Sequence, residues 1–253
     1  MICDTFKNLA YSTWNKIDDS RRVAFQLKEE TLTDINLLEL KLQHPTEIIT
    51  CDFTKHDEGR NGADWEWWFT NNREWKGFRV QAKVIDIHLD KFKHLHYQNP
   101  TSIPQSEKLI IQAECDKYYP LTPIYCFYLS TDKMDESAMY HPLKTYGCSL
   151  MNAYDVRTLR AGKICHVSEL QEYLMPWHEL VCHGSNETLL ERVKYVAGSF
   201  FKNPKKLKSE FDGTLSSPPD YIRHLQRAIG DNVHFDYVPQ SLAGVMIVTS
   251  EDI

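Results

Sequence analysis

Two neighbouring stretches of the chain have patterns typical of β-strands: the first is rich in aromatic residues, and the second alternates between apolar and polar side chains. Residues 63–69 read ADWEWWF, and residues 77–87 read GFRVQAKVIDI. Because successive side chains of a strand point to opposite faces, the second stretch has one apolar and one polar face. The apolar face carries Phe78, Val80, Ala82 and Val84, and the polar face carries Arg79, Gln81 and Lys83. The polar residues 71–76 predict a hairpin connection, so the chain must build a sheet that other elements cover.

The segments around this hairpin predict an α/β fold. Residues 3–45 have helical spacing with a break near residues 18–20, and they end before Pro45, which disfavours helix at the preceding residue. Strands are expected at residues 48–53 and 122–129, and a helix at residues 104–118. We therefore expect a mixed central β-sheet flanked by helices.

The domain organisation is predicted as a core over residues 1–130 and a helical or mixed C-terminal extension over residues 131–253. The extension includes a closing strand at residues 244–249. Packing of the extension on the core as one domain is the alternative.

Composition excludes several classes of protein. Hydrophobic residues make up 42% of the 253 residues, which is ordinary for a globular protein and excludes a disordered chain. No apolar run approaches the roughly 18 residues needed to span a bilayer, so no membrane partner is expected. The net charge of −6 excludes a globally basic nucleic-acid coat but permits a local basic cleft. Seven cysteines without regular spacing, and no signal-peptide pattern, predict reduced thiols and a cytoplasmic protein.

Three polar residues of the hairpin form a coherent chemical set. If the two strands pair, Asp64 meets Gln81 and Lys83 at one edge of the sheet. Carboxylate and amide oxygens suit hard divalent ions such as Mg²⁺, and a lysine beside such an ion can orient water and offset charge on a phosphate. This combination favours metal-assisted phosphoryl chemistry.

The motifs in this segment resemble those of a known superfamily. Gly59-x-x-Gly62-x-Asp64, followed by Val80-Gln81-Ala82-Lys83, is similar to the PD-(D/E)xK nucleases with the restriction-endonuclease-like fold. The neutral Gln81 resembles the Mrr-like subgroup, in which glutamine replaces the acidic residue of the final motif. The resemblance covers roughly residues 20–130, and the GADWEW and QAK motifs also resemble an uncharacterised bacterial family.

The resemblance implies a role for each matching residue. Asp64 would be the principal metal ligand, Gln81 and the Ala82 carbonyl would add oxygen ligands, and Lys83 would be the catalytic lysine. Because Gln81 is neutral, Glu66, two residues beyond Asp64, is an alternative ligand.

The family also takes a glutamate from the helix before the first strand. Glu29 and Glu30 are the candidates, and Glu30 is preferred because Leu27 and Asp34 flank it at helical spacing.

The implied function is hydrolysis of DNA phosphodiester bonds by metal-activated water, with Mg²⁺ or Mn²⁺ as cofactor and a role in restriction or antiviral defence. RNA is left open as a substrate, and a second copy of the chain or a regulatory protein is the expected partner. Nucleic-acid contacts are predicted at Lys202, Lys205, Lys206 and Trp75. The alternative is a non-catalytic nucleic-acid-binding or assembly module that keeps the nuclease fold.

A zinc site is not favoured by the spacing of the cysteines and histidines in the second half. The residues concerned are Cys148, Cys165, His166, His178, Cys182 and His183. They match no ligand pattern with closely spaced pairs, and buried structural cysteines are the preferred interpretation.

Overall fold

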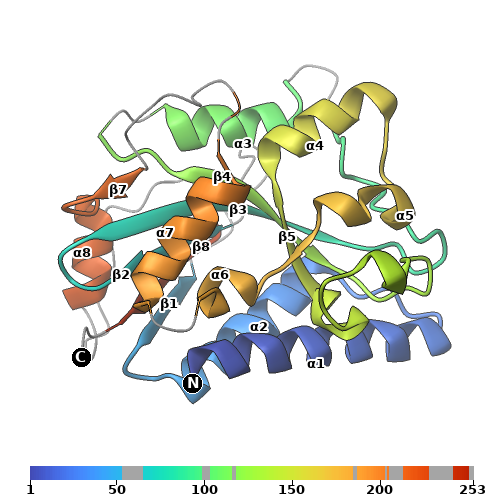
Figure 1. Cartoon of the computed structure of the whole chain (residues 1–253), viewed down its shortest axis with the longest axis horizontal. Coiled ribbons are helices and arrows are strands. Elements are labelled where there is room, and N and C mark those ends of the chain that lie inside the picture. The colour runs from blue at the N-terminus through green and yellow to red at the C-terminus, as the bar shows by residue number, and fades with distance from the viewer. Residues whose placement is uncertain are drawn as a thin grey trace.

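The fold was analysed in a computed structural model, which describes residues 1–52, 65–98, 103–115, 118–184, 187–202, 204, 213–227 and 242–250. These residues form an open, eight-stranded mixed sheet with helices on both faces (Figure 1). The predicted α/β class with a mixed central sheet is therefore confirmed.

The strands follow the order β1-β8-β2-β3-β4-β5-β6, and β7 pairs with β3. Two pairings, β2 with β8 and β3 with β4, are parallel, and the others are antiparallel. The strands are β1 Ile48–Asp52, β2 Trp65–Thr70, β3 Trp75–Val84, β4 Thr122–Tyr128, β5 Cys148–Asn152, β6 Met175–Pro176, β7 Thr214–Leu215 and β8 Gly244–Thr249.

Helices of very different length surround this sheet. The α-helices are α1 Ile2–Arg22, α2 Glu29–Gln43, α3 Gln105–Glu114, α4 Ala153–Leu159, α5 Val167–Leu170, α6 Glu179–Cys182, α7 Leu189–Phe200 and α8 Asp220–Arg227. Short 3-10 helices are η2 Glu136–Ala138, η3 Leu143–Gly147, η4 Arg160–Gly162 and η5 Gln171–Tyr173.

One face of the sheet packs against α2 and the end of α7. Thr33 of α2 hydrogen-bonds the hydroxyl of Tyr128, and Phe201 contacts Phe78 edge to face. On the same face Trp67 meets Trp177, whose indole N–H donates to the Phe6 carbonyl of α1. This side holds most of the hydrophobic core.

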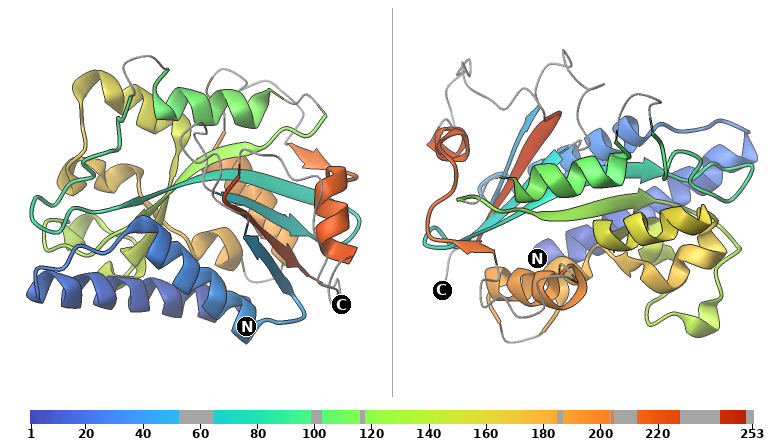
Figure 2. Two further views of the ribbon diagram at one scale, coloured as in Figure 1. Left: turned by 180° about the vertical axis from the view of Figure 1, so that it is seen from behind. Right: turned by 90° about the horizontal axis from the view of Figure 1, so that it is seen from above.

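The opposite face is covered by α3 and α8. Trp68, Trp75 and Ile247 form a small second core with Ile222 and Leu225 of α8. Helices α3 and α4 lie side by side (Figures 1 and 2), and Tyr154 donates a hydrogen bond to Glu114 across them.

The polar side of β3 faces this second layer and is buried. The exposed fractions are 7% for Arg79, 1% for Gln81 and 5% for Lys83. Ordinary surface strands expose such residues, because burying charged and amide groups costs free energy unless they are paired. The hairpin predicted from the alternation is confirmed, with Trp67 opposite Phe78.

Several predicted boundaries are wrong. α1 continues through residues 18–20 to Arg22, and the break falls at residues 23–28, where Ala24 has a φ of 52°. β3 begins at Trp75, because this residue pairs with Thr70 and with Leu215. Trp75 is only 4% exposed, so its predicted stacking against nucleic-acid bases is not supported.

The first and second halves of the chain share one sheet. β8 lies between β1 and β2, and β5 extends the sheet beyond β4 (Figure 2, left, for β1 beside β8). The predicted closing strand at residues 244–249 is confirmed, and it lies inside the sheet.

Two cysteines form a disulfide, so the prediction that all thiols are reduced is wrong for this pair. Cys3 of α1 joins Cys182 of α6, and the two cysteines are 179 positions apart in sequence. The sequence pattern missed it because the two partners are brought together only by the packing of α6 beside α1. The other five cysteines form no disulfide. Among the described residues, no helix combines the length and apolar character needed to cross a bilayer.

Candidate functional site

A pocket of about 630 Å³ opens at the end of β3. Its walls are residues 26–30 from the start of α2, residues 83–86 from β3 and the following loop, residues 92–94 with Tyr97, and Gln105 at the start of α3. β2 begins opposite Val80, so within the described part of the chain the last four residues of β3 pair with β4 alone. The pocket therefore lies at the end of β3 that follows its described pairing with β2.

Lys83 and Glu29 meet in this pocket. The Lys83 Nζ lies 3.8 Å from the Glu29 Oε1, and the Lys83 side chain is 7% exposed. Strand alternation places Lys83 on the α3 side of the sheet, and the first residue of α2 brings Glu29 to it. The result is a buried ammonium group next to a half-buried carboxylate.

The loop before α2 is tied to the chain beyond β3. Gln26 donates from Nε2 to the Ile85 carbonyl at 3.1 Å and accepts at Oε1 from the Ile87 N–H at 3.1 Å. The Gln26 side-chain amide thus bonds the backbone of residues 85 and 87 as a neighbouring strand would. These two hydrogen bonds hold the chain just before the start of α2. They therefore position Glu29 over Lys83.

Gln81 is oriented by a second glutamine. Its Oε1 accepts a hydrogen bond of 2.8 Å from Gln105 Nε2, and its Nε2 donates to the Ala82 carbonyl at 3.3 Å. The Gln81 side chain is fully buried, whereas Gln105 also lines the pocket. Gln105 was not singled out in the sequence, although a helix was predicted from residue 104, because nothing in the local pattern links Gln105 to Gln81.

The pocket carries charges of both signs. Lys28 and Lys93 add positive charge, and Glu30 and Asp86 add carboxylates. Burial opposes ionisation of Asp86, but hydrogen bonds from Lys93 and from the N–H groups of His88 and Leu89 lower its pKa overall. The basic groups suit phosphate binding, and the carboxylates suit a hard cation.

The structure favours Glu29 over the predicted Glu30. Only Glu29 contacts Lys83, whereas Glu30 lines the pocket with an exposed side chain. The sequence argument counted Leu27 as a helical position, but α2 begins at Glu29. Lys28, the cap position, makes no side-chain capping bond, so no local signal marked the boundary.

Glu66 belongs to a different network. It accepts hydrogen bonds from Trp68 Nε1 at 3.0 Å and from the Tyr221 hydroxyl, and Arg79 Nη1 lies 3.4 Å away. Burial raises the pKa of Glu66, although Arg79 and the two hydrogen bonds oppose this. Glu66 does not line the pocket and ties α8 to the sheet.

The remaining predicted residues are only partly placed. Asp64, Lys205 and Lys206 lie outside the described residues. Lys202 is exposed just after α7, and its carbonyl accepts a hydrogen bond from Asn152. Asp64 directly precedes Trp65, the register partner of Val80, which is the residue before Gln81.

The pocket offers oxygen atoms, which are the ligand type that hard divalent ions prefer. Glu29, Glu30 and Asp86 offer carboxylates at the pocket wall, whereas Gln81 and Ala82 do not line it and their oxygens accept hydrogen bonds from Gln105 and from the Gln81 amide. Among the described residues, however, no three acidic or histidine side chains converge here within coordination range. A magnesium site in this pocket would depend on Asp64 for its principal ligand.

The fold and the pocket define an α/β protein with an open mixed sheet and a lysine–carboxylate pair at the end of its central parallel strands. The chain belongs to the family described as "Family of unknown function (DUF6615)", whose model matches residues 2–252. Comparisons with curated proteins and with solved structures gave no match.

Proposed function

We propose that the protein is a metal-dependent nuclease that hydrolyses phosphodiester bonds of DNA in the pocket at the end of β3. The observation that carries the proposal is the buried Lys83, whose Nζ faces Glu29 in an open pocket beside the buried Gln81. Burying a lysine on a central strand costs several kcal/mol. A catalytic role explains why the strand carries it.

Each residue of the pocket has a specific task in this proposal. The Lys83 ammonium donates a hydrogen bond to an oxygen of the scissile phosphate and offsets its growing negative charge. Glu29 holds Lys83 in place and offers an oxygen to the ion, and Gln105 fixes the amide of Gln81. Lys28 and Lys93 at the pocket wall contact neighbouring phosphates.

Asp64, Glu29, the Gln81 amide and the Ala82 carbonyl would hold Mg²⁺ or Mn²⁺, and the ion would supply an activated water and further charge stabilisation. The resemblance to the PD-(D/E)xK nucleases supports Asp64 as the main ligand. The order α2, β1, β2, β3, α3, β4 matches the helices and strands that the sequence pattern predicts between residues 3 and 129. Glu66 is left out of the ligand set because it serves the buried network with Trp68, Arg79 and Tyr221 that ties α8 to the sheet.

The wider role is part of the same proposal and rests on the resemblance. We propose action in restriction or antiviral defence in the cytoplasm, with DNA as the substrate and RNA to be tested beside it. Control by a second copy or a regulatory protein would prevent damage to the host.

The alternative function is a nucleic-acid-binding or assembly module without catalysis. One observation favours it: the Gln81 oxygen already accepts a hydrogen bond from Gln105, and Gln81 carries no charge. Such a module would bind nucleic acid in a salt-dependent way through the lysines of the pocket.

A cleavage assay tests the proposal. Wild type and Lys83→Ala are incubated with supercoiled plasmid, linear duplex, single-stranded DNA and RNA, each with Mg²⁺, Mn²⁺ or EDTA. We expect metal-dependent cutting by wild type and a loss of at least about 100-fold in Lys83→Ala. Lys83→Met keeps the buried stem and replaces Lys83→Ala if the alanine variant does not fold.

Glu29→Gln and Glu30→Gln form a matched pair in this assay. The rate should fall at least about tenfold more in Glu29→Gln, because only Glu29 contacts Lys83. Undiminished cutting by Lys83→Ala would overturn the site assignment. Salt-dependent binding without cutting, retained in Glu29→Gln, would establish the binding module instead.

A further inference from the structure

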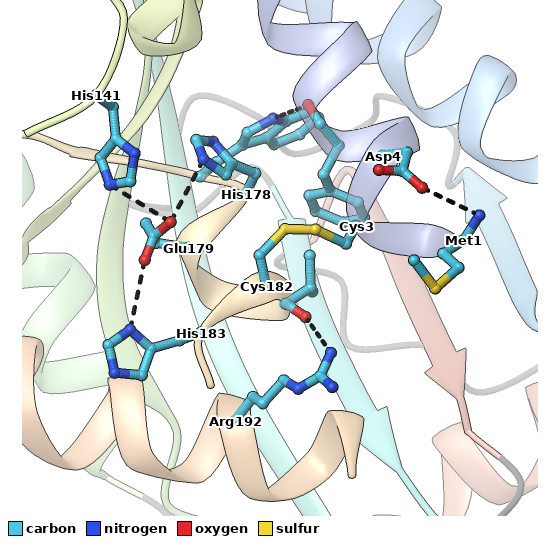
Figure 3. Close-up of a disulfide and its surroundings, with 12 residues drawn as sticks. Met1, Cys3, Asp4, His141, His178, Glu179, Cys182, His183 and Arg192 are labelled. Atoms are coloured by element: carbon cyan, nitrogen blue, oxygen red, sulfur yellow. Dashed lines mark hydrogen bonds and ion pairs between the residues drawn. A yellow bond between two sulfur atoms is a disulfide. The ribbon is translucent and has the colours of Figure 1, made fainter. Parts of the chain in front are cut away.

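Two histidines and a glutamate converge in the second half of the chain, at a place unrelated to the pocket. His141 lies just before η3, His178 caps the start of α6, and Glu179 is the first residue of that helix. Their ligand atoms all lie within 4.8 Å of one another, and Figure 3 shows both imidazoles directed at the carboxylate. None of the three lines the pocket at the end of β3.

Two of the distances in this cluster match those between ligands around a metal ion. The Nε2 atoms of His141 and His178 each lie 3.4 Å from the same oxygen, Glu179 Oε1. That separation is longer than the roughly 2.9 Å of a good N–H···O hydrogen bond. It equals the edge, about 3.4 Å, of a tetrahedron whose metal–ligand bonds are about 2.1 Å long.

The burial of the cluster suits a bound ion with one open position. His178 is 1% exposed, whereas the side chains of His141 and Glu179 are 31% and 19% exposed, so one side of the cluster faces solvent. The Nδ1 of His178 makes no hydrogen bond within the part of the chain that the structure describes.

A second group of contacts holds the cluster in place. His183 Nδ1 lies 3.4 Å from the other oxygen of Glu179, and its ring stacks on Tyr195 of α7. Trp177, next to His178, is pinned by its backbone bond to Cys148 and its indole bond to Phe6. The disulfide between Cys3 and Cys182 closes the far end of α6 (Figure 3). Outer contacts of this kind orient metal ligands in known sites.

We propose that His141, His178 and Glu179 bind one divalent transition-metal ion of the zinc type, with water as the fourth ligand. Two imidazole nitrogens and one carboxylate oxygen suit zinc, whereas Mg²⁺ prefers oxygen ligands alone. The site is independent of the proposed nuclease pocket, because none of its three residues lines that pocket. The cysteine and histidine spacing did not predict it, because His141 and Glu179 were not part of that pattern.

Calorimetric titration of the full-length protein, with its disulfide intact, tests the proposal. ZnCl₂ is the probe, and CoCl₂ supplies an absorption spectrum that reports the ligands. We expect one equivalent of Zn²⁺ per chain and a Co²⁺ spectrum of tetrahedral type without a thiolate charge-transfer band. Mg²⁺ should not compete at millimolar concentration.

Variants identify the ligands. His141→Ala removes a partly exposed ligand and should weaken zinc binding at least about 100-fold, and Glu179→Gln should act in the same direction. His183→Ala removes an outer contact and should cost about tenfold. His224→Ala, at an exposed histidine of α8, is the matched control and should bind as wild type does.

Three results would overturn the proposal. The folded wild type could fail to bind one equivalent of Zn²⁺, His141→Ala could bind Zn²⁺ as tightly as wild type does, or the Co²⁺ spectrum could contain a thiolate band. Circular dichroism of each variant establishes that it is folded. Nuclease activity is not the readout, so failure of the proposed function leaves this test intact.

Discussion

Individual buried charges determine much of the chemistry of this molecule, and Glu66 is the clearest example among the described residues. It is 2% exposed on a central strand and is bound by Trp68, Arg79 and Tyr221. These partners come from β2, β3 and α8, so one carboxylate joins three elements. A buried carboxylate of this kind binds its proton more tightly in the folded chain than in the unfolded chain.

Glu66→Gln should therefore alter both stability and its pH dependence. At pH 7 the variant should lose about 1–3 kcal/mol in free energy of unfolding, because the amide NH₂ group that replaces one carboxylate oxygen cannot accept a hydrogen bond from Trp68, Tyr221 or Arg79. Burial raises the pKa of Glu66 in the folded chain. Protonation of Glu66 therefore stabilises wild type fully at pH values below the pKa of the unfolded chain. This stabilisation is lost as the pH rises through the pKa of the folded chain.

The excess stability of wild type over Glu66→Gln should consequently grow as pH falls from 7 towards 4.5. Urea unfolding of both proteins at several pH values measures this difference in free energy of unfolding. A difference that decreases as the pH falls would contradict the raised pKa of Glu66.

At this scale the sequence predicts positions on β3 better than positions on α2. Strand alternation placed Gln81 and Lys83 on one face, and the structure agrees. It could not show that this face is buried, because α3 covers it from a distant part of the chain. It also preferred Glu30 to Glu29, since Lys28 gives no capping signal for the start of α2.

At the scale of elements, local pairings were predictable and distant ones were not. The β2–β3 hairpin follows from a short polar connection between two stretches with strand patterns. The position of β8 between β1 and β2 does not follow, because a strand pattern identifies a strand without naming its partner. Register of Trp65 with Gly244 is set by packing between residues far apart in sequence.

The packing of η3 on α1 gives an element-scale prediction with a matched control. A Cβ atom on Gly147 would lie 2.0 Å from the Ala10 carbonyl oxygen and 2.8 Å from the Trp14 nitrogen, which are both backbone atoms. Gly147→Ala should therefore destabilise the protein by about 3 kcal/mol or more, since the backbone of α1 has to move.

Gly198→Ala is the control for that substitution. Gly198 lies in α7, and a Cβ atom added there would meet no atom of another described side chain or strand within 4 Å, so alanine should stabilise the helix by about 0.5–1 kcal/mol. Thermal unfolding followed by circular dichroism should shift in opposite directions for the two variants. Equal shifts would mean that η3 and α1 are not in close contact.

At the scale of the whole molecule, the two halves of the chain are held together in two ways. β8 completes the sheet between β1 and β2, and the disulfide ties α1 to α6. The separation of 179 residues makes this a very long covalent loop. In the chain-entropy description, a disulfide that closes such a loop stabilises the folded state by about 3–5 kcal/mol.

Reduction of the disulfide should accordingly lower the melting temperature of wild type by about 10 °C. The double variant Cys3→Ser/Cys182→Ser should melt at the lowered temperature and should not respond to reductant. Cys115→Ser, at an exposed cysteine outside the disulfide, should behave as wild type. Thiol titration of unfolded, unreduced wild type should give five thiols per chain, because five cysteines form no disulfide. Seven thiols in protein taken directly from cells would instead match the reduced state expected of a cytoplasmic protein, and α1 would then be held to α6 by packing alone.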